Sequence, residues 1–399
     1  MSNQEIKELC LSLMKADTED EVIDILKKAG YWDKPECWRY YGDKENNYSA
    51  AGNQADEAEA ALVEKITNSR DAILMNECLI RGIDPKSKNA PSGVREAVAA
   101  FFEENPENEL AGQIKEWDPK KRREVAKLMS VYITGNKPAD GYPCLNFADR
   151  GEGQTPLKIP ETILSLGESI KRSIRFVHGK WNMGGTAALV YCGKQNLQLV
   201  ISRRNPKLLE QEDVSDKSDK NWGFTIVRRE DPEGVDTSST YRYLAPTGVD
   251  AKPNKGQLLN FSSDTLSIFA KYNEGYSVES EWGTLIKLYE YETKYKQNVQ
   301  GSGGLLRPLD LLAPDLGLPF RLHECRYQGK KPGSFEHQLN GLRVRLHDDR
   351  GNVLEQDYPT FHNFEIEGEK FSLAVYAFKD NKAKDYRDND KGVVFVLNG

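Results

Sequence analysis

The chain has 399 residues, more than one ordinary hydrophobic core accommodates, so we expect two domains. Its net charge of −7 gives no overall field that attracts nucleic acid. The sequence contains no run of 18 apolar residues, the length needed to span a membrane. The six cysteines show no CxxC spacing, and the N-terminus lacks the order of a signal peptide. We therefore expect a cytoplasmic protein with reduced thiols, without a zinc site or a disulfide framework.

The first part of the chain changes from a helical to a strand-rich pattern near residue 133. Helices are predicted over 4–30 (one or two), 55–80, 93–104 and 119–132. Short β-rich runs bounded by turn residues then predict strands at 143–148, 189–192, 197–202, 224–228 and 284–291. Between them, 205–222 and 229–258 are polar and rich in Gly and Pro. We expect long hairpin excursions there, or segments that are partly disordered.

A glycine-rich stretch at 300–304 is the best candidate for a linker between two units. Beyond it, strand-like runs at 342–346, 364–366, 371–378 and 393–396 predict a smaller unit that contains a sheet. The predicted domains are therefore 1–300 and 301–399. Because the sequence stops directly after an apolar strand-like run, we expect that the second unit is truncated.

The helix predicted over 55–80 has a polar face that suits a phosphate site. Glu64, Asn68 and Asp71 fall within about 60° of one another at 100° per residue, opposite an apolar stripe. On this face Glu64 could position and deprotonate a water molecule, and Asn68 could supply an oxygen ligand to Mg²⁺. The alternative is the solvated face of an ordinary surface helix.

Two glycine clusters bracket the segment from 154 to 178. Asp149 ends a predicted strand just before Gly151 and Gly153, where its carboxylate could accept a hydrogen bond from the exocyclic amine of adenine. The alternative is a simple Asx-turn before glycine. Ser165 and Lys171 lie in the intervening segment, which suits a loop over phosphates or an amphipathic helix over 161–170. The second cluster, 179–186, offers backbone N–H groups at a predicted helix start, but it is not a Walker A motif.

Four motifs in this order resemble those of the GHKL ATPase superfamily. This group includes type II topoisomerase ATPase subunits, Hsp90, MutL, MORC ATPases and sensor histidine kinases. The sequence EKITNSRDA at 64–72 resembles the family's N-box, E-x-x-x-N-S/A-x-D-A, and DRGEG at 149–153 resembles its D-x-G-x-G box. The sequence GKWNMGGT at 179–186 resembles the second glycine box, with Asn182 where many members have glycine. The sequence GTLIKL at 283–288 resembles the late strand whose threonine helps to hold adenine.

This resemblance implies an α+β fold, a two-layer α/β sandwich (the Bergerat ATP-binding fold) followed by a smaller transducer-like α/β domain. ATP and Mg²⁺ would lie between the helices and a mixed, largely antiparallel sheet. Glu64 would be the general base, Asn68 the Mg²⁺ ligand and Asp149 the adenine reader, with Thr284 as a second adenine contact. The other implied ATP contacts are Asp71, Gly151, Gly153, Ser165, Lys171, Gly179, Lys180, Asn182, Met183, Gly184, Gly185 and Thr186. For Asp71, a cap or an ion pair on its own helix is an equal alternative.

The resemblance also implies an ATP-gated homodimer that closes through residues 1–55 and a lid over 154–178, whose sequence is most similar to MORC-type lids. By analogy, such a switch would act in DNA metabolism or bacterial antiviral defence, on DNA or with a partner nuclease or helicase. The basic run at 120–123 could touch DNA, or it is an exposed helix start. An Hsp90-like chaperone and a non-catalytic ATP-binding scaffold are the alternatives. The transducer lysine would lie beyond residue 399, with Lys382, Lys384 and Lys391 as weaker candidates.

Overall fold

The computed structural model describes residues 1–48, 58–108, 110–137, 140–166, 173–178, 186–212, 216–232, 238–248, 256–293 and 317–326, with three further strands. Its helices are α1 (Asn3–Lys15), α2 (Glu19–Lys28), α4 (Ala58–Ile80), α5 (Val94–Phe102), α6 (Pro119–Val125) and α7 (Pro206–Leu209). Its strands are β1 (Trp38–Tyr40), β2 (Met129–Gly135), β3 (Pro143–Asp149), β4 (Gln198–Arg203), β5 (Trp222–Glu230), β6 (Thr240–Leu244), β7 (Leu259–Phe261), β8 (Leu266–Lys271), β9 (Glu274–Ser280), β10 (Gly283–Leu288), β11 (Phe320–Glu324), β12 (Glu336–Leu339), β13 (Thr360–Ile366) and β14 (Glu369–Val375).

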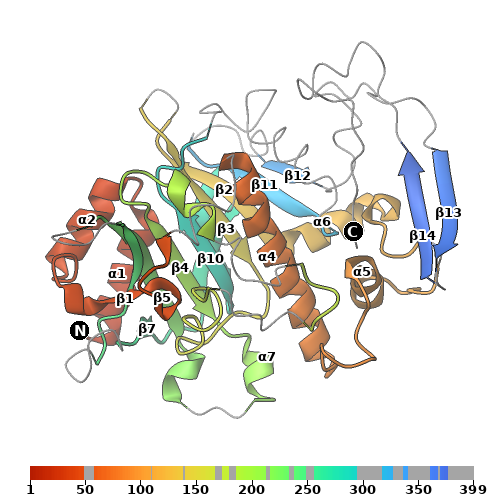
Figure 1. Cartoon of the computed structure of the whole chain (residues 1–399), viewed down its shortest axis with the longest axis horizontal. Coiled ribbons are helices and arrows are strands. Elements are labelled where there is room, and N and C mark those ends of the chain that lie inside the picture. The colour runs from red at the N-terminus through yellow and green to blue at the C-terminus, as the bar shows by residue number, and fades with distance from the viewer. Residues whose placement is uncertain are drawn as a thin grey trace.

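The described strands form one large mixed sheet and two separate pairs. The large sheet has ten strands in the order β1-β6-β5-β4-β10-β3-β2-β11-β12, with β7 paired to β5 (Figure 1). Its pairings are antiparallel except for β11, which runs parallel to β2. Strands β8 and β9 form a hairpin, and β13 pairs with β14. The molecule is therefore a mixed α/β protein of the α+β class with a largely antiparallel sheet, as predicted.

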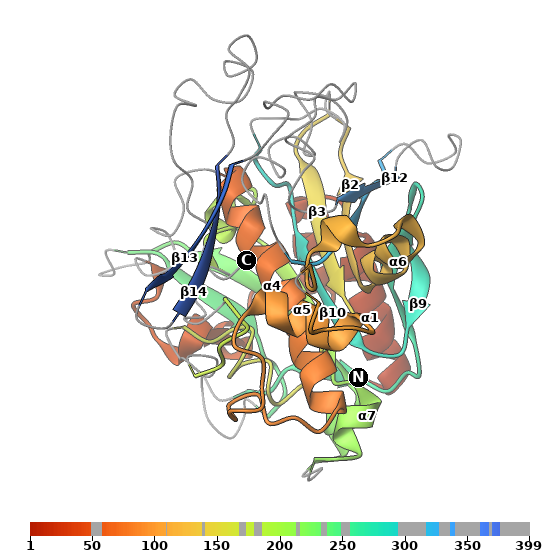
Figure 2. The ribbon, with the colours of Figure 1, turned by 90° about the vertical axis from the view of Figure 1, so that its right-hand side faces the viewer.

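The large sheet carries a hydrophobic core on each face in the described part of the chain. Along β3, Leu145 and Phe147 belong to the core under α4 and α5, whereas Cys144 and Ala148 belong to the core under α1 and α2. This alternation follows from the two-residue period of a strand. Figure 2 shows α4 and α5 in front of the strands. The predicted two-layer sandwich therefore accounts for only one face of the sheet, because α1 and α2 form a further layer on the other face.

Helix α1 is attached to β10 by polar contacts as well as by its apolar side. The fully buried Lys287 of β10 donates from Nζ to the carbonyl oxygens of Met14 (2.8 Å) and Ala16 (2.5 Å). The hydroxyl of Tyr289 donates to the Leu13 carbonyl at 2.6 Å. A cation at the C-terminal end of a helix satisfies its last carbonyls and complements its dipole. The N-terminal helices are thereby fixed to the strand that begins with the GT motif.

Most elements predicted for the described residues are confirmed, and two predictions are wrong. Residues 189–191 form a short 3₁₀ helix where a strand was expected. The helix expected over 119–132 ends at Val125, and a short 3₁₀ turn leads into β2, because its last residues are apolar and join the sheet. The excursion at 205–222 contains α7, and β6 lies within the excursion at 229–258. The strands expected at 342–346 and 393–396 lie outside the described residues.

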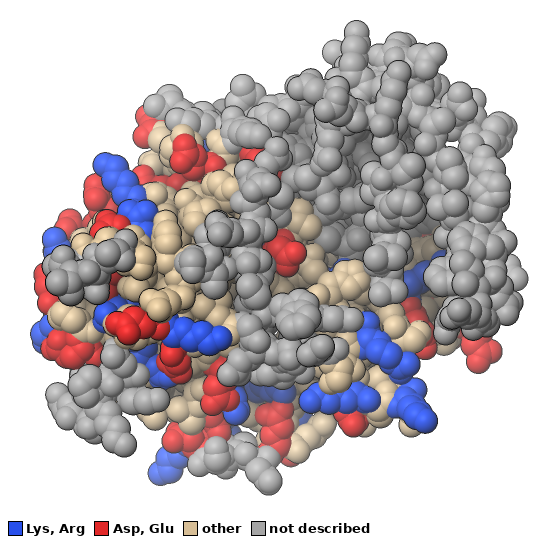
Figure 3. All heavy atoms as spheres, viewed as in Figure 1, with Lys and Arg blue, Asp and Glu red and all other residues tan. Residues whose placement is uncertain are grey.

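The predicted linker at 300–304 and the boundary at residue 300 also lie outside the described residues. On the far side of them, β11 pairs with β2, so the large sheet includes chain that follows the predicted boundary. No helix in the described part of the chain is both long and apolar enough to cross a bilayer. On the face shown in Figure 3, acidic and basic side chains are interspersed among the residues that the structure describes.

Candidate functional site

Helix α4 presents the predicted polar face of Glu64 and Asn68. The helix has no Gly or Pro in its 23 residues, and its apolar side chains, including Leu62, Ile66 and Ile73, are buried under the sheet. Opposite this stripe, Glu64 is exposed and Asn68 is half-buried. The structure therefore confirms that these two side chains share the solvent side of a helix anchored by its other side.

The carboxyl group of Glu64 has a pKa raised above its ordinary value. Desolvation by the surrounding protein is the main cause, although the side chain remains accessible, and the nearby Asp71 carboxylate raises the pKa further. The positive charges of Arg70 and Lys65 act in the opposite direction. A carboxylate with a raised pKa is a stronger base, which suits proton abstraction from water.

Lys65, next to Glu64, ties α4 to the sheet. Its ammonium group is buried and donates to the side-chain oxygen of Gln198, the first residue of β4, at 2.6 Å. Burial lowers the pKa of Lys65 to about 8. The contact places the N-terminal half of α4 over the start of β4. The motif match did not indicate this role, because the N-box pattern leaves this position open.

Asp71 is fully buried and does not share the exposed face with Glu64. Its Oδ1 accepts from the buried guanidinium of Arg70, with Nη2 at 2.5 Å and Nε at 3.1 Å. Its Oδ2 accepts from the backbone N–H of His178 at 2.8 Å. The structure thus shows the predicted alternative of an ion pair on the same helix. Asp71 also attaches the end of the 154–178 segment to α4.

The Asp149 turn packs directly on α4 at Ala72. Asp149 Oδ1 accepts from the backbone N–H of Gly151 at 2.9 Å, so the predicted Asx-turn is present. The N–H of Glu152 donates to the Ala72 carbonyl at 3.0 Å. A Cβ at position 151 would collide with the Ala72 side chain, so only glycine permits this approach. Two motifs far apart in the sequence are therefore in contact.

Gly153 makes the second close approach of this turn, to the end of β4. It has φ of +61°, and a Cβ there would collide with the carbonyl oxygen of Arg203. The positive φ and the missing side chain explain why glycine is required at this position. The pattern Asp149-x-Gly151-x-Gly153 thus fits between α4 on one side and β4 on the other.

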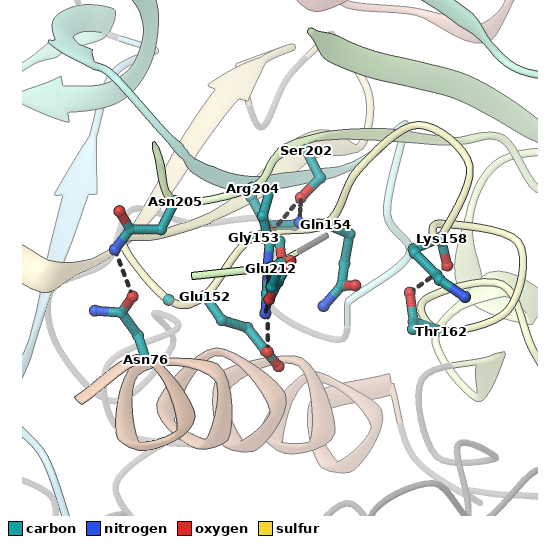
Figure 4. A network of polar contacts seen from close by, with 12 residues as sticks. Asn76, Glu152, Gly153, Gln154, Lys158, Thr162, Ser202, Arg204, Asn205 and Glu212 are labelled. Atoms are coloured by element: carbon teal, nitrogen blue, oxygen red, sulfur yellow. Dashed lines mark hydrogen bonds and ion pairs between the residues drawn. The ribbon is translucent and has the colours of Figure 1, made fainter. Parts of the chain in front are cut away.

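Residues after β4 hold the same turn in place, and Figure 4 shows this network above α4. Arg204 Nη1 pairs with Glu152 Oε2 at 2.7 Å and donates to the Gly153 carbonyl at 3.2 Å. The N–H of Asn205 donates to the Glu152 carbonyl at 2.9 Å, and its side chain donates to Asn76 of α4 at 2.7 Å. Sequence analysis missed these contacts, because position 205 was assigned to the start of an excursion.

The GT motif lies beside Asp149 in the sheet. Thr284 is the register partner of Asp149 on β3 and of Ser202 on β4. All three side chains point to the α4 face, since they alternate with residues of the opposite core. The hydroxyls of Thr284 and Ser202 lie 2.9 Å apart, and the N–H of Gln154 donates to Ser202 Oγ at 2.9 Å. The structure therefore brings the fourth motif to the second, as predicted.

Most of the second glycine cluster lies outside the described residues. The predicted ATP contacts outside the described residues are Lys171, from the segment before this cluster, and Gly179, Lys180, Asn182, Met183, Gly184 and Gly185 within it. Thr186, at the end of the cluster, is fully buried. Ser165 is also buried, and its hydroxyl donates to the Thr162 carbonyl at 3.0 Å within a local turn. The described half of the helix considered at 161–170 is a series of turns.

The described parts of the 154–178 segment are packed into cores. Ile159, Leu164 and Leu166 belong to a cluster with residues of β4, β5 and β6. Ile174, Phe176 and Val177 belong to the core under α4 and α5. Moving the whole segment would expose these side chains to water, at a free-energy cost of about 1.5–3 kcal/mol for each large one. A lid that spans all of 154–178 therefore does not match this packing.

Comparison with known protein families finds no matching family, and comparison with curated proteins finds no significant match. The fold and the site define a mixed α/β protein with carboxylate, amide and hydroxyl groups gathered on one face of its large sheet. Within the described residues, no group of three or more His, Cys, Asp or Glu side chains is placed to hold a metal ion.

Proposed function

We propose that this chain is a Mg²⁺-dependent ATPase of the GHKL type, with its nucleotide between α4 and the strands β3, β10 and β4. The observation that carries the proposal is the assembly of three distant motifs. Ala72 of the N-box contacts Gly151, and Asp149 lies beside Thr284. These contacts require a glycine at 151 for steric reasons, so the match between pattern and packing is specific.

The adenine end of the site would be the Asp149 carboxylate with the Thr284 hydroxyl beside it. Asp149 is buried at the end of β3, in the same row of the sheet as Thr284. A carboxylate can only accept hydrogen bonds, so it selects a donor such as the exocyclic amine of adenine. Burial strengthens this contact, because water competes poorly for the same oxygen.

The phosphate end would lie over the N-terminal half of α4. Asn68 would give one side-chain oxygen to Mg²⁺, and phosphate oxygens and water would supply the other ligands, as is usual for this ion. Bound Mg²⁺ would offset the phosphate charge. Glu64, one turn away on the same face, would orient the attacking water and accept its proton. The raised pKa of Glu64 supports this role.

We expect Asp149→Asn to weaken ATP binding by about 10- to 100-fold, the value of one charge-assisted hydrogen bond. Asparagine keeps an acceptor for the Gly151 N–H but places an NH₂ group opposite the adenine amine. Titration calorimetry with Mg²⁺-ATP measures the change. Ser130→Ala is the matched control, because Ser130 is buried in β2 on the other face of the same sheet. Unchanged ATP affinity in Asp149→Asn would remove Asp149 from the adenine site.

We also propose that ATP closes the chain into a homodimer that acts as a conformational switch. Light scattering with Mg²⁺ and a non-hydrolysable ATP analogue should then give twice the monomer mass, and the nucleotide-free chain should not. Asp149→Asn at the same nucleotide concentration is the control. A monomer at high protein concentration with saturating analogue contradicts the dimer. Exchange of α1 between subunits is a costly route, since it breaks the contacts of Lys287 with Met14 and Ala16.

The process served by this switch is proposed by analogy as DNA metabolism or antiviral defence, with DNA or a partner nuclease or helicase. The basic run at 120–123 lies in α6, a helix without buried residues. Lys121 Nζ lies over the Trp117 ring at 4.4 Å, while Lys120 and Arg123 are exposed and accessible to phosphates. Contacts with DNA phosphates would make binding fall steeply with salt. A chaperone that binds unfolded protein would not show this dependence.

A further inference from the structure

Ser202 lies at one end of the row that contains the candidate adenine contacts Thr284 and Asp149. It is fully buried on β4, one strand away from Thr284 and two strands away from Asp149 in the same row. Its hydroxyl is surrounded by three polar groups. The N–H of Gln154 donates to it at 2.9 Å, Thr284 Oγ1 lies at 2.9 Å, and the Gly283 carbonyl oxygen lies at 3.3 Å.

Counting protons restricts what this hydroxyl can do. Ser202 has one hydrogen to donate, and its oxygen already accepts from Gln154. If the hydrogen points to Thr284, the Thr284 hydroxyl accepts it and is left to donate its own hydrogen elsewhere. If Thr284 instead donates to Ser202, the Ser202 hydrogen must use the Gly283 carbonyl. That contact, at 3.3 Å, exceeds the usual length of an O–H···O bond, so the first direction is favoured.

We propose that Ser202 is a specificity-determining residue that orients the Thr284 hydroxyl as a donor and so selects adenine over purines with a 6-keto group. This inference rests on the proposed ATP site. Adenine has a donor amine at C6 and an acceptor at N1. Inosine and guanine have the reverse, an acceptor at C6 and a donor at N1. A row with the Asp149 carboxylate as acceptor and Thr284 as donor matches the adenine edge directly or through a bound water.

The part of the selectivity that depends on Thr284 arises from the two unequal contacts of Ser202. The N1–H of inosine can be paired only if Thr284 turns to accept, which drives the Ser202 hydrogen to the longer contact with Gly283. Without the Ser202 hydroxyl, Thr284 rotates to either direction at equal cost. Removing this hydroxyl should therefore weaken ATP and relieve the penalty on ITP, so their affinity ratio falls. One neutral hydrogen bond corresponds to a change of about 3- to 10-fold.

The test compares Kd values for ATP, ITP and purine riboside triphosphate with the full chain. Ser202→Ala is expected to lower the ratio of ATP to ITP affinity by about 3- to 10-fold. Purine riboside triphosphate keeps N1 but has no amine, so its affinity should fall in Ser202→Ala by the same factor as that of ATP. Ser202→Thr keeps the hydroxyl at this position and should keep the ATP to ITP affinity ratio of the unmodified chain. Ser130→Ala, a buried serine on the opposite face, should not change it.

Loss of an acceptor for Gln154 could also loosen the turn, so a second measurement isolates the hydroxyl pair. In a Thr284→Val background, adding Ser202→Ala should leave the ATP to ITP ratio unchanged, because no hydroxyl remains to be oriented. An unchanged ratio in Ser202→Ala alone, or equal weakening of ATP and ITP, overturns the proposal. If the unmodified chain binds no ATP, the proposed ATPase function fails with it, and this outcome is recognised before any variant is compared.

Discussion

Replacing Glu64 by Gln should abolish ATP turnover, with a fall in kcat of about 10²- to 10⁴-fold, the usual contribution of a general base. ATP affinity should stay nearly unchanged, because Glu64 acts on water and not on the nucleotide. Phosphate release under saturating Mg²⁺-ATP gives kcat, and calorimetry gives the affinity. Turnover that survives in Glu64→Gln would remove Glu64 from its proposed role, and loss of ATP binding would indicate a contact with the nucleotide.

The same helix offers a matched control for Glu64. Glu77 lies further along α4 and pairs with Arg81 at 2.5 Å. Glu77→Gln makes the same chemical change and should leave kcat within about twofold, because it removes a partly exposed ion pair and keeps an acceptor for the long contact from Asn76 Nδ2 at 3.4 Å. A parallel loss of turnover in both variants would point to damage to α4 and not to a missing base.

The pH dependence of turnover follows from the raised pKa of Glu64. The base acts as a carboxylate, so kcat/KM should rise with pH through the pKa of Glu64 and then level off. Because burial and the Asp71 charge raise this pKa, the acidic limb should lie above the ordinary glutamate value of about 4.3. The free energy of unfolding changes in the opposite direction, and falls as pH rises through the pKa of Glu64. Ionised Glu64 costs folding free energy above its pKa, so Glu64→Gln should be at least as stable as the unmodified chain near neutral pH.

Replacing Asp71 by Ala should lower the free energy of unfolding by about 3–5 kcal/mol, because it removes the carboxylate that pairs with the buried Arg70 charge. The His178 N–H also loses its acceptor, which releases the end of the 154–178 segment from α4. The free energy of unfolding from urea titration measures the effect. An unchanged unfolding midpoint would show that the ion pair contributes nothing.

A double variant separates the effect of the remaining Arg70 charge from the effect of the lost Asp71 side chain. Arg70→Met with Asp71→Leu removes both charges and keeps apolar volume in the same place. It should be more stable than Asp71→Ala, since replacing a buried ion pair by apolar groups is often neutral. If the double variant is no more stable, the fall in Asp71→Ala comes from packing and not from the Arg70 charge. ATP binding by the double variant then tests whether Asp71 also serves the nucleotide.

Local sequence patterns predicted α4 and its polar face well, because helical period is a property of a short stretch of chain. Glu64 and Asn68, four residues apart, lie one turn apart on the same side of the helix. The same period placed Asp71 on that face, yet the structure buries it with Arg70. Periodicity specifies direction around the helix axis but not what packs against each turn. Asp71 is contacted by His178, and the core under α5 also includes residues far from α4 in the sequence. Helical periodicity carries no information about such distant segments.

The sequence by itself determined the glycines of the Asp149 turn, the polar face of α4 and the order of the motifs, because these depend on neighbouring residues. Only the tertiary structure decided that β10 lies between β3 and β4, which places Thr284 beside both Asp149 and Ser202. Strand order depends on long-range pairing, and no local pattern carries it. For the same reason, Ser202 and Arg204 had no signal in the sequence, although both contact groups in the turn or beside it.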